Sequence, residues 1–226
     1  MMKINNSVMQ GLKISILTLA MSGGIVAAKE EAKSYDTVNK DIVVTVGEKA
    51  GEINTVNGEI EIRKMAVVGS IDTVNGDISL AEKVTAKGID SVNGDVEASN
   101  NVTIEKNIAT VNGEVTFEEG SKIKGNINSV NGDIELDGVS MNGNIEVVNS
   151  DVILKKGTVI DGDLIVKKNK GSSSFFGLFS DSSGSKPKIK IGDNVVIKGQ
   201  IILYRKVKLD VSDSAKIPEI DYRYKK

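Results

Sequence analysis

One tripeptide recurs through most of this chain at a nearly constant spacing. Intact copies of Val-Asn-Gly begin at Val56, Val74, Val92, Val111 and Val130, and degenerate copies begin at Val38 and Val148. The steps between successive copies are 18, 18, 18, 19, 19 and 18 residues. A period this regular indicates a repeat protein, in which each unit is stable only when it stacks on its neighbours.

Each repeat shows the alternation of apolar and polar residues that is typical of half-buried strands. A Thr or Ser precedes the Val, an acid follows the Gly, and apolar residues then occupy alternate positions, as in Asp77-Ile78-Ser79-Leu80. Asn-Gly supplies the positive φ that a tight corner requires. Helical repeats need units of about 33 residues or more. We therefore predict an all-β, single-stranded parallel β-helix (β-solenoid) with about 18 residues and three short strands per coil, and eight to nine coils.

The regions around the repeat predict the organisation of the chain. Residues 1–28 carry Lys3 and Lys13, no acid, a short apolar run and small residues ending at Ala28, which is the order typical of a secretory signal peptide. We expect cleavage near Ala28-Lys29 and export to the periplasm, cell envelope or beyond; a retained N-terminal membrane anchor is the alternative. The further expectations are an N-terminal lead-in or cap over 29–41, the solenoid over 42–217 with an inserted loop at 167–187, and a basic C-terminal tail over 218–226.

Composition removes several classes of chemistry. The chain has no Cys and no His, which excludes a cysteine nucleophile, a Ser-His-Asp triad and the ordinary zinc sites. A formal net charge of −2 gives no overall attraction to nucleic acid. We therefore expect a protein that is not an enzyme, with no cofactor, no nucleic-acid partner and no small-molecule substrate.

Two polar columns follow from aligning the repeats. The first is predicted to be a structural ladder of stacked amides formed by Asn57, Asn75, Asn93, Asn112, Asn131 and Asn149. The second is the acid after each Gly, for which Ca²⁺ binding is an alternative because carboxylate oxygens suit that ion. Paired carboxylates also leave a remote alternative, a polysaccharide-acting enzyme, although acids that recur in every coil favour a structural role.

The inserted loop carries the most distinctive residues outside the repeat. Three of the four Phe in the chain lie in a Ser/Gly-rich segment from 171 to 185. Either this segment folds back on the solenoid, or it contacts a partner, a second subunit or a membrane surface. The predicted contact residues are Phe175, Phe176, Leu178 and Phe179.

Charge is distributed unevenly along the predicted rod. Residues 29–168 hold 25 acids and 15 bases, a net charge of −10, whereas residues 186–226 hold 5 acids and 11 bases, a net charge of +6. One end is thus acidic and the other basic, and a head-to-tail contact that does not close generates filaments. End-to-end self-association is therefore one predicted interaction; contact of the basic tail with an anionic envelope polymer is the other reading.

The repeated Thr/Ser-Val-Asn-Gly-Asp/Glu-Ile-x-Leu unit, over about residues 37–217, resembles two groups of proteins. One is the bactofilins, polymer-forming cytoskeletal β-helix proteins, and the other is the adhesin-type repeat families of unknown function. The likeness to bactofilins implies a right-handed, triangular β-helix that polymerises end to end without nucleotide. Bactofilins are cytoplasmic, whereas this chain carries an export signal and an inserted loop. We expect an exported structural protein that self-assembles or scaffolds in the cell envelope; an adhesin-like or partner-binding module is the alternative.

A short segment near the C-terminus resembles a second family. Residues 191–199 (IGDNVVIKG) are similar to the hexapeptide repeat of left-handed β-helix acyltransferases. Those enzymes use a histidine base, which this chain lacks, so the likeness implies fold and no activity.

Overall fold

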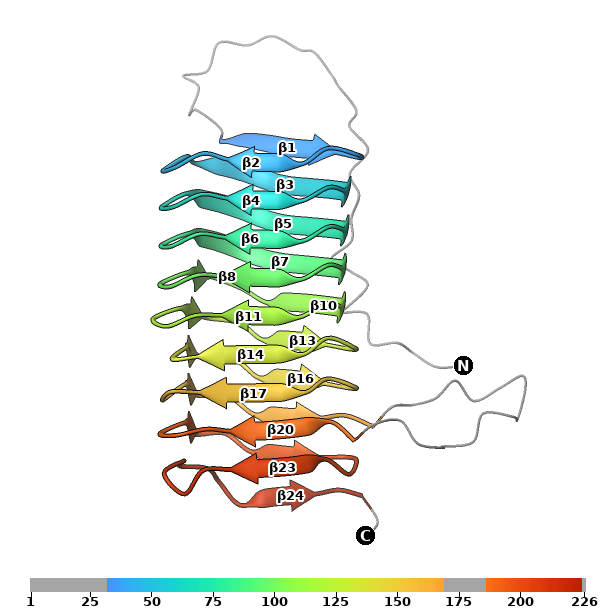
Figure 1. Ribbon diagram of the computed structural model, residues 1–226, viewed down its shortest axis with the longest axis vertical. Coiled ribbons are helices and arrows are strands. Elements are labelled where there is room, and N and C mark those ends of the chain that lie inside the picture. The colour runs from blue at the N-terminus through green and yellow to red at the C-terminus, as the bar shows by residue number, and fades with distance from the viewer. Residues whose placement is uncertain (1–31, 169–185, 225–226) are drawn as a thin grey trace, which may run out of the picture.

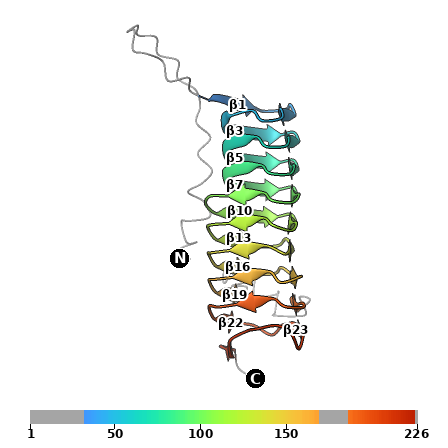
Figure 2. The same ribbon diagram turned by 90° about the vertical axis from the view of Figure 1, so that its left-hand side faces the viewer.

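The computed structural model describes residues 32–168 and 186–224. Figure 1 shows a straight stack of coils, running from β1 at one end to β24 at the other, and Figure 2 shows the coils in single file. The predicted signal peptide and the predicted contact residues of the inserted loop lie outside the described residues.

The first column of strands contributes one strand to each coil, and its nine members confirm an all-β solenoid of about nine coils. Every pairing in it is parallel, and core-facing residues meet core-facing residues, as at Ile60, Ile78 and Val96. The strands are β2 (Ile42–Val44), β4 (Ile60–Ile62), β6 (Ile78–Leu80), β8 (Val96–Ala98), β11 (Val115–Phe117), β14 (Ile134–Asp137), β17 (Val152–Lys155), β20 (Lys188–Ile191) and β23 (Lys208–Val211).

The second column changes character part-way along the rod. It begins with the short strand β1 (Lys33–Thr37), and the next three strands are long and bent: β3 (Ala50–Asn57), β5 (Val67–Asn75) and β7 (Thr85–Asn93). Beyond β7 each bent strand is replaced by two short ones, which form separate columns. The later members of the second column are β10 (Ile108–Asn112), β13 (Ile127–Ser129), β16 (Ile145–Val147), β19 (Leu164–Val166), β22 (Ile201–Leu203) and β24 (Ile220–Tyr222).

The third column exists only in the later coils. It consists of β9 (Thr103–Ile104), β12 (Lys122–Ile123), β15 (Ser140–Met141), β18 (Val159–Ile160) and β21 (Val196–Ile197). Because β7 pairs with both β9 and β10, it is the strand at which the sheet divides. The three-strand coil predicted from the sequence therefore describes the later coils, and the early coils merge two of the three segments into one bent strand.

A single inserted residue accounts for this division. Ala86 pairs with Ile104 and Ile89 pairs with Ile108, so the later segment contains one residue more than the earlier one. The extra residue lets the chain turn sharply at Lys106-Asn107, where the earlier coils bend gradually through Gly88. The same residue explains why the repeat step lengthens from 18 to 19.

The interior is an unbroken column of aliphatic side chains. Ile, Val and Leu dominate it, and Phe117 is the largest fully buried side chain. Phe117 lies in register between Ala98 and Leu136, so a small neighbour on one side makes room for the ring. Thr and Ser occupy the remaining inward positions, among them Thr73 and Thr110, whose hydroxyls have no partner among the described residues.

The ordered ladder extends further than the predicted solenoid of 42–217. On the N-terminal side, β1 pairs with β3. On the C-terminal side, β24 follows Pro218 and pairs with β22. Pro218 lies in a corner between strands, where the missing backbone N–H removes no ladder hydrogen bond.

Candidate functional site

The predicted asparagines form one continuous column at the Val-Asn-Gly corner. Each Nδ2 donates to the Oδ1 of the asparagine one coil before it, over 2.7–3.0 Å, from Asn149 back to Asn39. At the far end Arg205 Nη1 donates to Asn149 Oδ1 over 2.7 Å and occupies the next place in the column. These amides satisfy one another, and this corner is structural.

The acid after each Gly has a comparable role wherever it is an aspartate. Asp77 Oδ1 accepts the backbone N–H of Asp95, and Asp95 Oδ1 accepts that of Glu114, over 2.9 and 2.7 Å. Glu59 and Glu114 are one methylene longer and accept no such bond within the described residues. The aspartates thus act as backbone acceptors between coils.

The described residues provide no support for a metal at these corners. Across 32–168 and 186–224, no group of three or more Asp or Glu residues is placed to hold a metal ion.

A second side-chain ladder, which the sequence analysis missed, stabilises the sharp corner of the later coils. Asn107 Oδ1 accepts the backbone N–H of Asn126, and Asn126 Oδ1 accepts that of Asn144, over 2.9 and 2.8 Å. Asn144 Oδ1 and Asp163 Oδ1 extend the series by accepting the backbone N–H groups of Asp163 and Gln200. In the sequence, the sign of this ladder is a polar residue directly before the core Ile or Leu that begins each later strand of the second column, as in Asn107-Ile108 and Asn126-Ile127.

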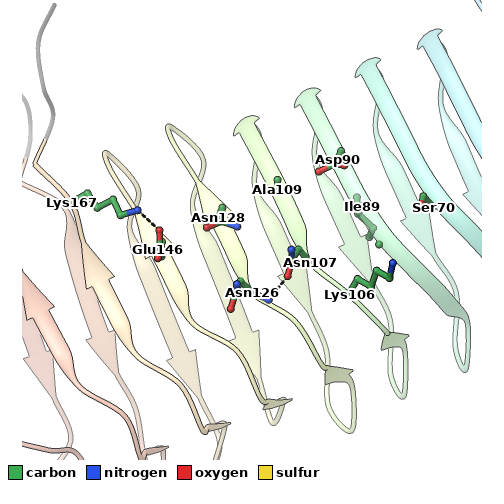
Figure 3. Close-up of a pocket in the computed structure, with 11 residues that line it drawn as sticks. Ser70, Ile89, Asp90, Lys106, Asn107, Ala109, Asn126, Asn128, Glu146 and Lys167 are labelled. Carbon is green, nitrogen blue, oxygen red and sulfur yellow. Dashed lines mark hydrogen bonds and ion pairs between the residues drawn. The ribbon is translucent and has the colours of Figure 1, made fainter. Parts of the chain in front are cut away.

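A hollow lies on the outer surface where the bent coils give way to the sharp ones. It has a volume of about 380 Å³, and we call it the switch hollow. Figure 3 shows its side chains following one another across successive strands, with Ala109 between Asp90 and Asn128. Its lining is Ser70, Gly88, Ile89, Asp90, Lys106, Asn107, Ala109, Asn126, Asn128, Glu146 and Lys167.

Two neighbouring carboxyl groups mark the edge of this hollow. Asp72 and Asp90 are register partners on β5 and β7, and both are half-buried. Burial raises the pKa of Asp72 to about 7, helped by repulsion from Asp90 and Glu52. Burial also raises the pKa of Asp90, while a hydrogen bond with Asp72 opposes that rise. Asp72 therefore keeps its proton to a higher pH than an exposed aspartate does.

The two ends of the rod form a second candidate surface, and they differ. At the N-terminal end, Tyr35 of β1 occupies the inward register and donates its hydroxyl to Glu48 Oε1 over 2.6 Å. This hydrogen bond, followed by those from Thr45, lowers the pKa of Glu48. Lys33 Nζ lies 4.3 Å from the centre of the Tyr35 ring. Polar contacts therefore surround Tyr35 at the N-terminal end, while β1 and β2 have one strand partner each within the described residues and keep an open outer edge.

The C-terminal end leaves apolar side chains partly uncovered. Leu209 pairs with the core residue Ile189 and Tyr222 pairs with the core residue Leu203, so both face the solenoid axis. They are nevertheless 36% and 47% exposed. Within the described residues β23 and β24 also have one strand partner each, which leaves their outer edges open.

Comparison with known proteins returned no relative. No protein-family model, no curated protein and no solved structure matches the chain. In the part of the chain that the structure describes, no helix has the length and apolar character needed to cross a membrane.

Proposed function

We propose that this protein is an exported structural rod that assembles end to end in the cell envelope. The observation that supports the proposal is the uncovered core at the C-terminal end, where Leu209 and Tyr222 face the axis yet remain exposed. An unpaired parallel strand edge over an apolar cross-section is a template for another coil. A second copy of this chain offers the matching strands β1 and β2 at its opposite end.

The distribution of charge supports the same orientation. The body of the rod up to residue 168 is acidic, and the part beyond the inserted loop is basic. Opposite charges on opposite ends favour head-to-tail contacts, which propagate without closing. The resemblance to bactofilins supports polymerisation as well, and the pattern of residues 1–28 supports export.

Negative-stain electron microscopy across a protein concentration series tests the proposal. We expect filaments a single rod wide at high concentration and single rods at low concentration. Tyr222→Lys should prevent filaments, because a charge at the contact must be buried without a partner. Val67→Lys is the matched control, since Val67 is 44% exposed but lies on β5, away from either end.

The result has clear alternatives. Circular dichroism must show that both variants keep the β-sheet spectrum of the parent chain. Single rods at every concentration and salt would contradict assembly and favour the partner-binding module. Filaments that survive Tyr222→Lys unchanged would contradict the proposed contact.

A further inference from the structure

We propose that the switch hollow binds a neutral glycan chain that offers hydroxyl and amide groups and lies along the rod axis. This inference does not depend on end-to-end assembly, because the hollow lies on the side of the rod. The hollow lies where the second column divides and the corner changes form.

The hollow presents hydrogen-bond donors that the fold leaves unused. The Oδ1 atoms of Asn107 and Asn126 each accept a hydrogen bond from a backbone N–H of the next coil. That bond fixes the orientation of each amide, and neither Nδ2 donates to another described residue. Two amide donors on neighbouring coils are thus held ready at the hollow. Binding groups fixed in advance lose little conformational entropy when a ligand arrives.

Acceptors lie on the facing column. Asp90, Asn128 and Glu146 occupy equivalent outward positions on β7, β13 and β16, as their strand registers show. Carboxylate and amide oxygens accept from hydroxyl and amide donors, so the two columns together match a ligand that carries both kinds of group.

The charge of the lining favours a neutral ligand. Asp90 and Glu146 are balanced by Lys106 and Lys167, and Lys167 forms an ion pair with Glu146. A polyanion such as nucleic acid requires a surplus of Lys and Arg, which the hollow lacks. The lining contains no aromatic side chain, so polar contacts must provide orientation.

The shape of the hollow favours an extended chain. Its lining comes from β5, β7, β10, β13 and β16, from the corners that precede β10 and β13, and from Lys167, which follows β19 and forms an ion pair with Glu146. Strands in a sheet lie about 4.8 Å apart, so the hollow extends roughly 20 Å along the rod. Ala109 is the smallest side chain in its column and opens the middle of this track.

Calorimetric titration of the full chain with chitohexaose, an uncharged glycan that carries hydroxyl and amide groups, tests the inference. We expect measurable binding, and Ala109→Arg should weaken it at least tenfold by filling the middle of the hollow. Ser79→Arg is the matched control, because Ser79 is an exposed outward residue at the centre of β6 on another column. That variant should bind as the parent does.

Asn128→Ala adds a variant that removes hydrogen-bonding groups without filling space. Asn128 belongs to neither side-chain ladder, so the rod should stay folded while the affinity falls several-fold. Absence of heat at millimolar chitohexaose would overturn the inference. So would equal affinities for the parent and Ala109→Arg, or tighter binding of the polyanion polygalacturonate than of chitohexaose. Filament formation by Ala109→Arg, judged by microscopy, reports separately on end-to-end assembly.

Discussion

The early and later coils of this rod share the same repeat and the same kind of aliphatic core, but the chain passes through one corner in two different ways. In β3, β5 and β7 the strand bends and its ladder of backbone hydrogen bonds continues around the corner. From Asn107 onward the strand breaks, and a side-chain Oδ1 replaces the backbone carbonyl as acceptor. One additional residue thus exchanges a backbone acceptor for a side-chain acceptor, without disturbing the columns on either side.

The largest expected difference comes from adding a methyl group within a sharp corner and at the junction between the two kinds of corner. A Cβ on Gly143, in a sharp corner, would collide with the carbonyl oxygen of Gly125. A Cβ on Gly88, at the junction, would lie 3.2 Å from the carbonyl oxygen of Asn107, which belongs to the first sharp corner. We expect Gly143→Ala to lower the free energy of unfolding by about 2–3 kcal/mol, and Gly88→Ala by clearly less.

Urea unfolding followed by circular dichroism measures both glycine variants. Each midpoint is compared with that of the parent at equal denaturant slope, so that the change reports stability. Equal losses at the two sites would show that the junction is as crowded as the sharp corner.

The side-chain ladder of the sharp corner can be broken at a single amide. Asn126→Ala removes the acceptor for the backbone N–H of Asn144. Leaving that donor unsatisfied should cost about 1–2 kcal/mol. Ser70→Ala, in a bent corner where no side-chain ladder bond is made, should stay close to the parent. The same urea series compares the two, and an equal loss in Ser70→Ala would remove the ladder as the explanation.

The Asp72 carboxyl makes the stability of the folded protein depend on pH. Its pKa rises from 3.8 to about 7 on folding, mainly through burial and also through repulsion from Asp90 and Glu52. The folded state therefore binds this proton more tightly than the unfolded state does. The contribution of protonated Asp72 to the free energy of unfolding is fully present below pH 4 and is lost as the pH rises through 7. Because Asp72 is partly exposed, solvent screening limits the loss to on the order of 1 kcal/mol.

Asp72→Asn keeps the shape of the side chain and removes the titration. We expect the stability of the variant relative to the parent to increase between pH 4 and pH 8, as measured by thermal unfolding at each pH. A difference between the two proteins that stays constant over this range would mean that the Asp72 carboxyl titrates normally.

The smallest expected difference concerns the asparagine column, whose side-chain hydrogen bonds continue through both regions. Asn75 lies in the bent region and Asn131 in the sharp one, and both donate to the preceding asparagine, over 2.8 and 3.0 Å. Asn75→Ser and Asn131→Ser should each cost roughly 0.5–1 kcal/mol, and equally. Unequal losses in urea would show that the change of corner reaches further than its own column.

Much of the fold could be predicted because the repeat fixes its own register. Val-Asn-Gly at a constant step places Asn75 above Asn57 in any stacked coil, and the alternation after each Gly assigns residues such as Ile78 to the core. The position of the inserted residue was harder to interpret. The step of 19 was visible between Val92 and Val111, but a lengthened step does not say which corner receives the extra residue.

The candidate site was less predictable for a related reason. Asp72 and Asp90 each follow a core Ile, and in the sequence they look like two exposed acids among many. Their half-burial depends on the side chains of the neighbouring coils, and the equivalent outward residues Ala109 and Asn128 are half-buried as well. The hollow beside Asp90 is likewise formed by side chains from several coils, and a local pattern of residues does not encode that arrangement.

The asparagine column has a direction, because each amide N–H points toward β1 and each amide oxygen toward the C-terminal end. Aligned amide dipoles add up, as peptide dipoles do along an α-helix. The column therefore carries a positive pole at Asn39 and a negative pole at Asn149. The arginine that contacts Asn149 lies at that negative pole, where a cation is electrostatically favoured. Neutral side chains thus give the rod a dipole along its axis, in addition to the uneven distribution of its ionised side chains.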